Sequence, residues 1–161
     1  MLFRSISIPN LVVVSPDLGG LKMAAAYAQQ LSSELAIVAK RRTSPTETEA
    51  ISVIGEIEGR NILLVDDLTE TAGTLVNAAA LLKSRGAGQI RACVSHALVN
   101  DLGAERLRKS VIDELITTDT VVRPAIEGVR ITTLSVAGLL GEAIKRIHSN
   151  SSVTSLFEFK G

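Results

Sequence analysis

Short runs of Val, Ile and Leu alternate along this chain with longer stretches in which apolar residues recur at helical spacing. This alternation constrains the fold most strongly, because strands joined by helical crossovers assemble into largely parallel sheets. The run from Ile62 to Val65 is continuously apolar and bounded by polar residues, which is typical of a central strand that helices cover on both faces. The chain is therefore predicted to be α/β, with an open, mostly parallel sheet flanked by helices.

The same periodicity predicts where the individual elements lie. Strands are expected over 11–14, 35–39, 62–65, 90–95 and 111–117, with a short strand or bent arm over 51–54. Helices are expected over 21–31, 75–82, 104–109 and 136–147. The last helix is expected to turn its apolar residues inward: Val136, Leu139, Leu140, Ala143, Ile144 and Ile147. A chain of 161 residues without a long Pro/Gly/Ser-rich stretch is expected to form one domain, residues 1–161.

Composition argues against several classes of function. Lys plus Arg and Asp plus Glu both number 17, so no basic stripe is available for a nucleic-acid backbone. The single cysteine, Cys93, excludes a disulfide framework and is expected to be a buried thiol. No run approaches the roughly 18 apolar residues of a membrane span, and no charged leader precedes a long apolar segment. We expect a cytoplasmic protein with neither a nucleic-acid nor a membrane partner.

Three loops that follow predicted strands carry the candidate functional residues, at 17–20, 40–42 and 66–74. Ligands of open α/β sheets bind beyond the carboxyl ends of the strands, where these loops would meet. The glycine-rich fingerprints of dinucleotide-binding and Walker-type proteins are absent from the sequence, so both classes lose their main support.

The third loop is the most informative of the three. Asp66 and Asp67 precede a run of Thr, Glu, Thr, Ala, Gly and Thr that leads into a helix, which predicts a phosphate cradle of backbone amides. The acidic pair is suited to sugar hydroxyls or to a hydrated Mg²⁺. The alternative is that the aspartates merely end a strand and that Thr69 or Thr71 caps the helix.

Several segments lie in order along the chain and together resemble one family. VDDLTETAGTL at 65–75 resembles the phosphoribosyl diphosphate (PRPP) loop of type I phosphoribosyltransferases and PRPP synthetases. VVSPDLGG at 13–20, IVAKRR at 37–42, GEAIKRIH at 141–148 and SVTSLF at 152–157 resemble the carboxyl-terminal half of ribose-phosphate pyrophosphokinase, that is, PRPP synthetase. The likeness runs from about Pro9 to Phe157.

The resemblance implies a type I phosphoribosyltransferase fold and a ribose-phosphate diphosphokinase activity, which converts ATP and ribose 5-phosphate to AMP and PRPP with Mg²⁺ as cofactor. It implies that Asp17 binds the metal and that Lys40 and Arg42 are catalytic, stabilising the transferred diphosphate with positive charge. It assigns ribose 5-phosphate to Asp66, Asp67, Thr69, Glu70, Thr71, Ala72, Gly73 and Thr74. From the residues alone, an ordinary turn residue is the alternative for Asp17, and a solvated charge cluster is the favoured interpretation of 40–42.

Departures from the family pattern leave three hypotheses open. Only one of the family's two similar halves is present, Glu70 stands where Asp is usual, and Met23 stands where Arg is common. The chain is therefore the ribose-5-phosphate-binding half of a synthetase, acting as a homo-oligomer or with a separate amino-terminal half, or a non-catalytic regulatory subunit of a synthetase. The third hypothesis, a phosphoribosyltransferase, needs a hood over the base, for which this aromatic-poor chain has no spare segment.

Overall fold

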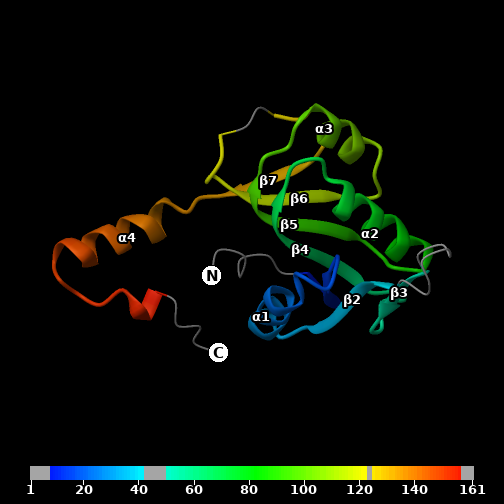
Figure 1. Cartoon of the computed structure of the whole chain (residues 1–161), viewed down its shortest axis with the longest axis horizontal. Coiled ribbons are helices and arrows are strands. Elements are labelled where there is room, and N and C mark those ends of the chain that lie inside the picture. The colour runs from blue at the N-terminus through cyan, green and yellow to red at the C-terminus, as the bar shows by residue number, and fades with distance from the viewer. Residues whose placement is uncertain (1–7, 42–49, 123–124, 157–161) are drawn as a thin grey trace.

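The computed structural model describes residues 8–41, 50–122 and 125–156 (Figure 1). Along the chain its elements are β1 (Leu11–Ser15), α1 (Leu21–Leu31), β2 (Glu34–Arg41), β3 (Ala50–Ile54), β4 (Asn61–Thr69), α2 (Gly73–Ser84), β5 (Ile90–Ala97), α3 (Asp101–Arg108), β6 (Glu114–Thr118), β7 (Ile131–Leu134), α4 (Ala137–His148) and a 3₁₀ turn (Thr154–Leu156).

The strands form one seven-stranded sheet in the order β3-β2-β1-β4-β5-β6-β7. All neighbouring strands pair in parallel except β3, which runs antiparallel to β2 at one edge. The predicted open and mostly parallel sheet is confirmed. From β1 the chain builds outward to β2 and β3 on one side, then returns to place β4 on the other side of β1. The crevice between the ends of β1 and β4 is therefore the topological switch point of the sheet.

Helices cover both faces of the central strands. Val13 and Leu63 pack on one face in a cluster with Ala24 of α1. Val12 and Leu64 pack on the opposite face in a cluster with residues of α2 and α3. Because successive side chains of a strand alternate between these two buried faces, β1 and β4 need apolar residues at every position, as their sequences show.

Cys93 lies in this core, as its apolar surroundings predict. Burial raises the pKa of its thiol far above the ordinary value. The thiol therefore stays protonated near neutral pH and packs as a small apolar group.

Several element boundaries differ from those predicted. Strand β4 continues through Asp66 to Thr69, because Leu68 and Thr69 pair with His96 and Ala97 of β5. Strand β7 was not predicted from the polar-looking run ITTL; pairing with β6 stabilises it. In both cases a neighbouring strand decides the local structure.

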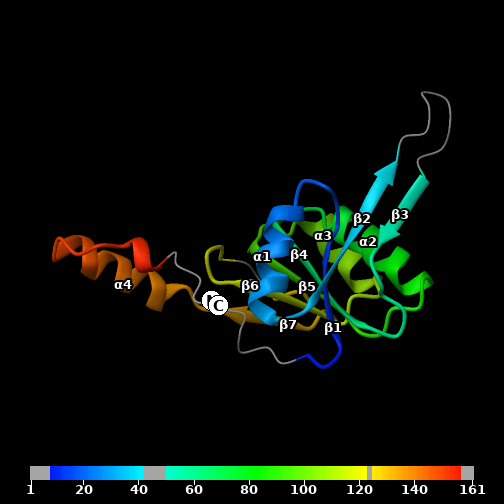
Figure 2. The same cartoon turned by 90° about the horizontal axis from the view of Figure 1, so that it is seen from below.

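The inward orientation predicted for the last helix is wrong. Helix α4 forms close to the predicted range, but it buries none of its residues, and Leu140, Ile144 and Ile147 are all more than half exposed. Figures 1 and 2 show why: α4 follows the edge strand β7 and extends away from the sheet. The apolar period therefore predicted the helix correctly but not what its apolar face meets.

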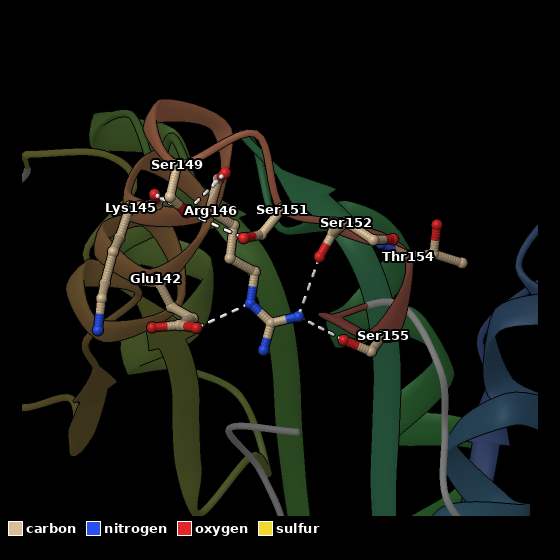
Figure 3. A network of polar contacts seen from close by, with 8 residues as sticks. All are labelled: Glu142, Lys145, Arg146, Ser149, Ser151, Ser152, Thr154 and Ser155. Carbon is tan, nitrogen blue, oxygen red and sulfur yellow. Dashed lines mark hydrogen bonds and ion pairs between the residues drawn. The ribbon is translucent and has the colours of Figure 1, made fainter.

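The segment after α4 turns back along the helix and is held by Arg146 (Figure 3). The Arg146 guanidinium forms an ion pair with Glu142 at 2.7 Å and donates to the Ser152 carbonyl at 3.1 Å. It also donates to the Ser155 hydroxyl. The arm formed by α4 and residues 149–156 thus has its own polar contacts.

Within the described ranges, no helix combines the length and the apolar character that crossing a bilayer requires.

Candidate functional site

Two of the three predicted loops meet at the switch point of the sheet. Val14 of β1 pairs with Leu64 of β4. Asp17 follows Val14 by three residues and Asp66 follows Leu64 by two, so both aspartates come near the same edge of the sheet. A Cβ atom on Gly20 would lie 3.9 Å from the Asp17 Oδ1 atom and 4.0 Å from the Val65 carbonyl oxygen, and the negative charge of Asp17 contributes to raising the pKa of Asp66. The structure therefore brings the candidate metal residue beside the candidate sugar-phosphate loop.

Asp17 is held in a tight turn that leads into α1. Its Oδ1 atom accepts a hydrogen bond from the Gly20 amide at 3.0 Å, and the buried Ser15 hydroxyl donates to its carbonyl at 2.7 Å. A Cβ atom on Gly20 would lie 2.8 Å from the Ser15 Oγ atom, so the turn needs glycine there. Asp17 can thus be a turn residue and a metal ligand at the same time, because the hydrogen bond from the Gly20 amide fixes the carboxylate and uses only Oδ1.

The acidic pair at the end of β4 lies in a region of negative potential. Asp66 is half-buried, and this burial raises its pKa to about 6 despite a hydrogen bond from the Asp67 amide at 2.9 Å. The charges of Asp67 and Asp17 raise it further. Such a cluster of carboxylates favours a cation or hydrogen-bond donors beside it.

No cage of protein ligands is formed around this cluster. Over residues 8–41, 50–122 and 125–156, no three His, Cys, Asp or Glu side chains converge in an arrangement that could hold a metal ion by themselves. One or two carboxylates that leave the remaining positions to water and phosphate oxygens are the usual surroundings of Mg²⁺ in phosphate sites.

The loop between β4 and α2 leaves its backbone amides free. In the described part of the chain, the amides of Glu70 to Leu75 donate no hydrogen bond to a protein acceptor, and the first bond of the helix runs from Val76 to Ala72. Ala72 is buried and adopts a left-handed conformation with φ of 53°, a strained choice for a residue other than glycine. Unpaired amides at a helix N-terminus are an anion-binding arrangement.

The alternative roles for this segment fail in part. Ala72 precedes α2 at the capping position, and no side chain caps the helix, so neither Thr69 nor Thr71 serves that purpose. Asp66 to Thr69 belong to the strand, however; the Asp67 amide donates to the Asp66 carboxylate, and Thr69 is buried. Only the part of the predicted cradle from Glu70 onward presents its backbone to a ligand.

Of the two predicted catalytic residues, Lys40 and Arg42, the structure describes only the position of Lys40. The backbone of Lys40 lies in β2 and pairs with Ile51 of β3. Since Ile37 is the residue paired with Ser15, Lys40 lies three residues, or about 10 Å, beyond the end of β1. Figure 2 shows the pair β2–β3 projecting past the other strands. Arg42 lies outside the described residues.

A segment that the sequence does not single out supports the loop from behind. The Leu98 amide donates to the Thr69 carbonyl at 2.9 Å, and the Asn100 amide donates to the Glu70 carbonyl at 3.1 Å. The Asn100 side chain also accepts from the Gly103 amide at 2.9 Å and so caps α3. The N-cap residue type was a readable signal for the start of α3, but its contact with a distant loop has no signature in the sequence.

Comparisons with known proteins identify the family of the chain. Residues 41–158 match the family model described as the phosphoribosyl synthetase-associated domain. The chain is 44% identical over 151 residues to a ribose-phosphate pyrophosphokinase of Chlorobaculum tepidum, covering 94% of this chain and 47% of that protein. It is 47% identical over 152 residues to the ribose-phosphate pyrophosphokinase of Bordetella pertussis, covering 92% of this chain and 48% of that protein.

Solved structures give the same answer. A phosphoribosylpyrophosphate synthetase from Mycobacterium smegmatis matches with a TM-score of 0.77 and 29% identity, over 92% of this chain and 47% of that one. An orotate phosphoribosyltransferase from Aeropyrum pernix matches with a TM-score of 0.51 and 20% identity, over 83% of this chain and 66% of that one, and this likeness shows the fold alone. The chain spans about half the length of the curated relatives it matches. It belongs to the phosphoribosyl synthetase-associated domain family, and its relatives are ribose-phosphate pyrophosphokinases.

Proposed function

We propose that this chain is the ribose-5-phosphate-binding half of a ribose-phosphate diphosphokinase, which forms PRPP and AMP from ATP and ribose 5-phosphate. The observation that carries the proposal is the row of unpaired amides from Glu70 to Leu75, at the end of β4 beside two carboxylates. The names of the relatives support the same reaction.

The parts of the loop suit the parts of a sugar phosphate. The amides of Glu70 to Thr74, with the exposed hydroxyls of Thr71 and Thr74, would bind the 5-phosphate at the positive end of α2. Asp66 and Asp67 would accept hydrogen bonds from the ribose hydroxyls. Thr69 is buried and would support the loop without touching the ligand.

The carboxylates also fit Mg²⁺. Asp17 and Asp66 offer hard oxygen donors whose mutual repulsion a divalent cation would relieve. When bound, the ion supplies positive charge to the phosphate oxygens of the substrates. Asp17 is the residue that we assign to hold it, with its free carboxylate oxygen.

The reaction requires an attack by the anomeric hydroxyl of ribose 5-phosphate on the β-phosphorus of ATP. A new oxygen–phosphorus bond forms, the bond from the β-phosphorus to the bridging oxygen breaks, AMP leaves with that oxygen, and the hydroxyl proton is released. Lys40 and Arg42 would stabilise the charge that develops on the transferred diphosphate. The loop residues would hold the sugar in line for attack.

A calorimetric titration tests the binding function directly. Ribose 5-phosphate is expected to bind the chain in the presence of Mg²⁺, and free ribose, which lacks the phosphate, is the matched control ligand. Heat of binding that is absent up to millimolar ribose 5-phosphate would count against the proposal.

Two departures from the family pattern, Glu70 and Met23, favour a second candidate, a non-catalytic regulatory subunit of a full-length synthetase. AMP release from ATP and ribose 5-phosphate, measured with and without an added amino-terminal half, separates the two functions. Turnover by the chain alone would require a homo-oligomer that is complete in itself; turnover only after addition would require the partner half. Release of pyrophosphate from PRPP with a nucleobase would instead indicate a phosphoribosyltransferase.

A further inference from the structure

Three consecutive carbonyl groups of the phosphate loop are held by one stretch of chain. The carbonyl of Thr69 accepts from the Leu98 amide and that of Glu70 from the Asn100 amide. The carbonyl of Thr71 accepts from the Nη1 atom of Arg106 at 3.1 Å. All three donors belong to α3 or to the residues immediately before it.

These contacts set the direction of the loop's amides. No peptide bond in the described chain is cis, and in a trans peptide the C=O and N–H groups point in opposite directions. Since the carbonyls of residues 69–71 face α3, the amides of Glu70, Thr71 and Ala72 point away from α3. They are the same amides that have no acceptor within the described protein.

The backbone of α3 lies unusually close to the loop. A Cβ atom on Gly103 would lie 2.3 Å from the Glu70 carbonyl oxygen and 3.2 Å from the Thr71 carbonyl carbon. Only a glycine permits this approach, because a methyl group would push the loop off the helix. The contact between α3 and the loop is therefore specified at two positions of the helix, Gly103 and Arg106.

Arg106 also brings charge to the loop. Its Nη1 atom would lie 3.1 Å from a Cβ atom on Gly73, so the guanidinium lies directly beside the first residue of α2. Among the described residues, none of the ion pairs involves Arg106. Its positive charge therefore adds to that of the helix N-terminus.

We propose that Arg106 is a positioning residue for phosphate binding: it holds the Thr71 carbonyl, and thereby aims the amide of Ala72 at the ligand, while its positive charge favours an anion. The inference rests on the proposed function for the identity of the ligand, ribose 5-phosphate. It concerns a residue that would act through the loop.

Three variants test the proposal. Arg106→Met removes both the donor and the charge, whereas Arg106→Lys keeps a charged donor. Arg108→Met is the matched control. Arg108 lies two residues after Arg106 on α3, and it donates to a carbonyl outside the loop, that of Glu127, at 3.1 Å. Each variant is measured in two ways: by titration with ribose 5-phosphate and Mg²⁺, and by hydrogen exchange of the Leu98 and Asn100 amides, which donate to the Thr69 and Glu70 carbonyls of the loop.

Arg106→Met is expected to weaken ribose 5-phosphate binding by about tenfold or more, the effect of losing one charge-assisted hydrogen bond. It is also expected to speed hydrogen exchange of the Leu98 and Asn100 amides without speeding it in β4. Arg106→Lys should recover most of the affinity, and Arg108→Met should change neither quantity.

Unchanged exchange and unchanged affinity in Arg106→Met would overturn the inference, as would an equal loss in Arg108→Met. Faster exchange of the Leu98 and Asn100 amides in a chain that binds no ribose 5-phosphate would instead overturn the proposed ligand while leaving the positioning role of Arg106 standing. Faster exchange throughout the sheet in Arg106→Met would overturn the positioning role, since Arg106 would then be a general stabilising residue.

Discussion

Replacing Asp66 by asparagine should stabilise the folded chain, although it removes a residue from the proposed site. Burial and two neighbouring carboxylates raise the pKa of Asp66 from 3.8 to about 6, so its ionised form is disfavoured in the folded state. If the carboxyl were fully buried, a shift of this size would correspond to about 3 kcal/mol. Because the side chain is only half-buried, solvent screening reduces the expected gain to about 1 kcal/mol.

The pH dependence gives this prediction its sign. Between about pH 4 and pH 6 the folded chain binds more protons at Asp66 than the unfolded chain does. The stability that this group contributes is therefore fully present below its unfolded pKa of 3.8 and is lost as the pH rises through its folded pKa of about 6. Asp66→Asn should therefore melt about 2–4 °C higher than the native chain at pH 7.5, and the difference should close near pH 4. The amide oxygen of asparagine can still accept from the Asp67 amide.

The control for this experiment is Asp119→Asn, measured by the same thermal unfolding. The Asp119 carboxylate accepts hydrogen bonds from Ser135 and from the Val136 amide, which lower its pKa, so its replacement should give no stabilisation at pH 7.5. An Asp66→Asn variant that is less stable than the native chain at pH 7.5, or whose advantage persists unchanged at pH 4, would refute the electrostatic argument.

Two further substitutions test the packing and a buried charge of the sheet. Leu64→Ala empties a fully buried position of β4 and should cost about 3 kcal/mol of unfolding free energy, measured as a lower urea midpoint with an unchanged slope; a loss below about 1 kcal/mol would contradict the two-sided burial of this strand. Glu114→Gln removes the buried charge that pairs with Arg91 at 3.3 Å and Arg130 at 3.5 Å, and it retains an acceptor for the Thr132 hydroxyl. The substitution should cost about 2 kcal/mol of unfolding free energy in urea. No loss of stability would mean that Glu114, Arg91 and Arg130 are fully solvated.

The parts of the fold that the sequence predicted well are those whose residues meet their partners on every side. The apolar runs of β1 and β4 are buried on both faces, so the pattern itself specifies a central strand. The position of the site followed from the same pattern, because parallel strands bring their carboxyl ends to one edge.

The failures have a common physical origin in contacts between distant segments. The polar end of β4 and the short β7 are strands only because a neighbour pairs with them. Arg106 was not foreseen because its partner, the Thr71 carbonyl, is a backbone atom and has no signature in the sequence. The conformation of Ala72 was equally hidden, since alanine seldom adopts a positive φ.

The exposed helix α4 has a consequence for how the chain unfolds. A solitary helix of 12 residues is only marginally stable in water, and α4 buries no side chain that would anchor it to the sheet. We therefore expect α4 to fray separately from the melting of the sheet and to respond to the solvent or surface that covers Leu140, Ile144 and Ile147. Order in this arm, followed through the ellipticity or the protection of its own amides, thus reports on its surroundings while the phosphate loop remains intact.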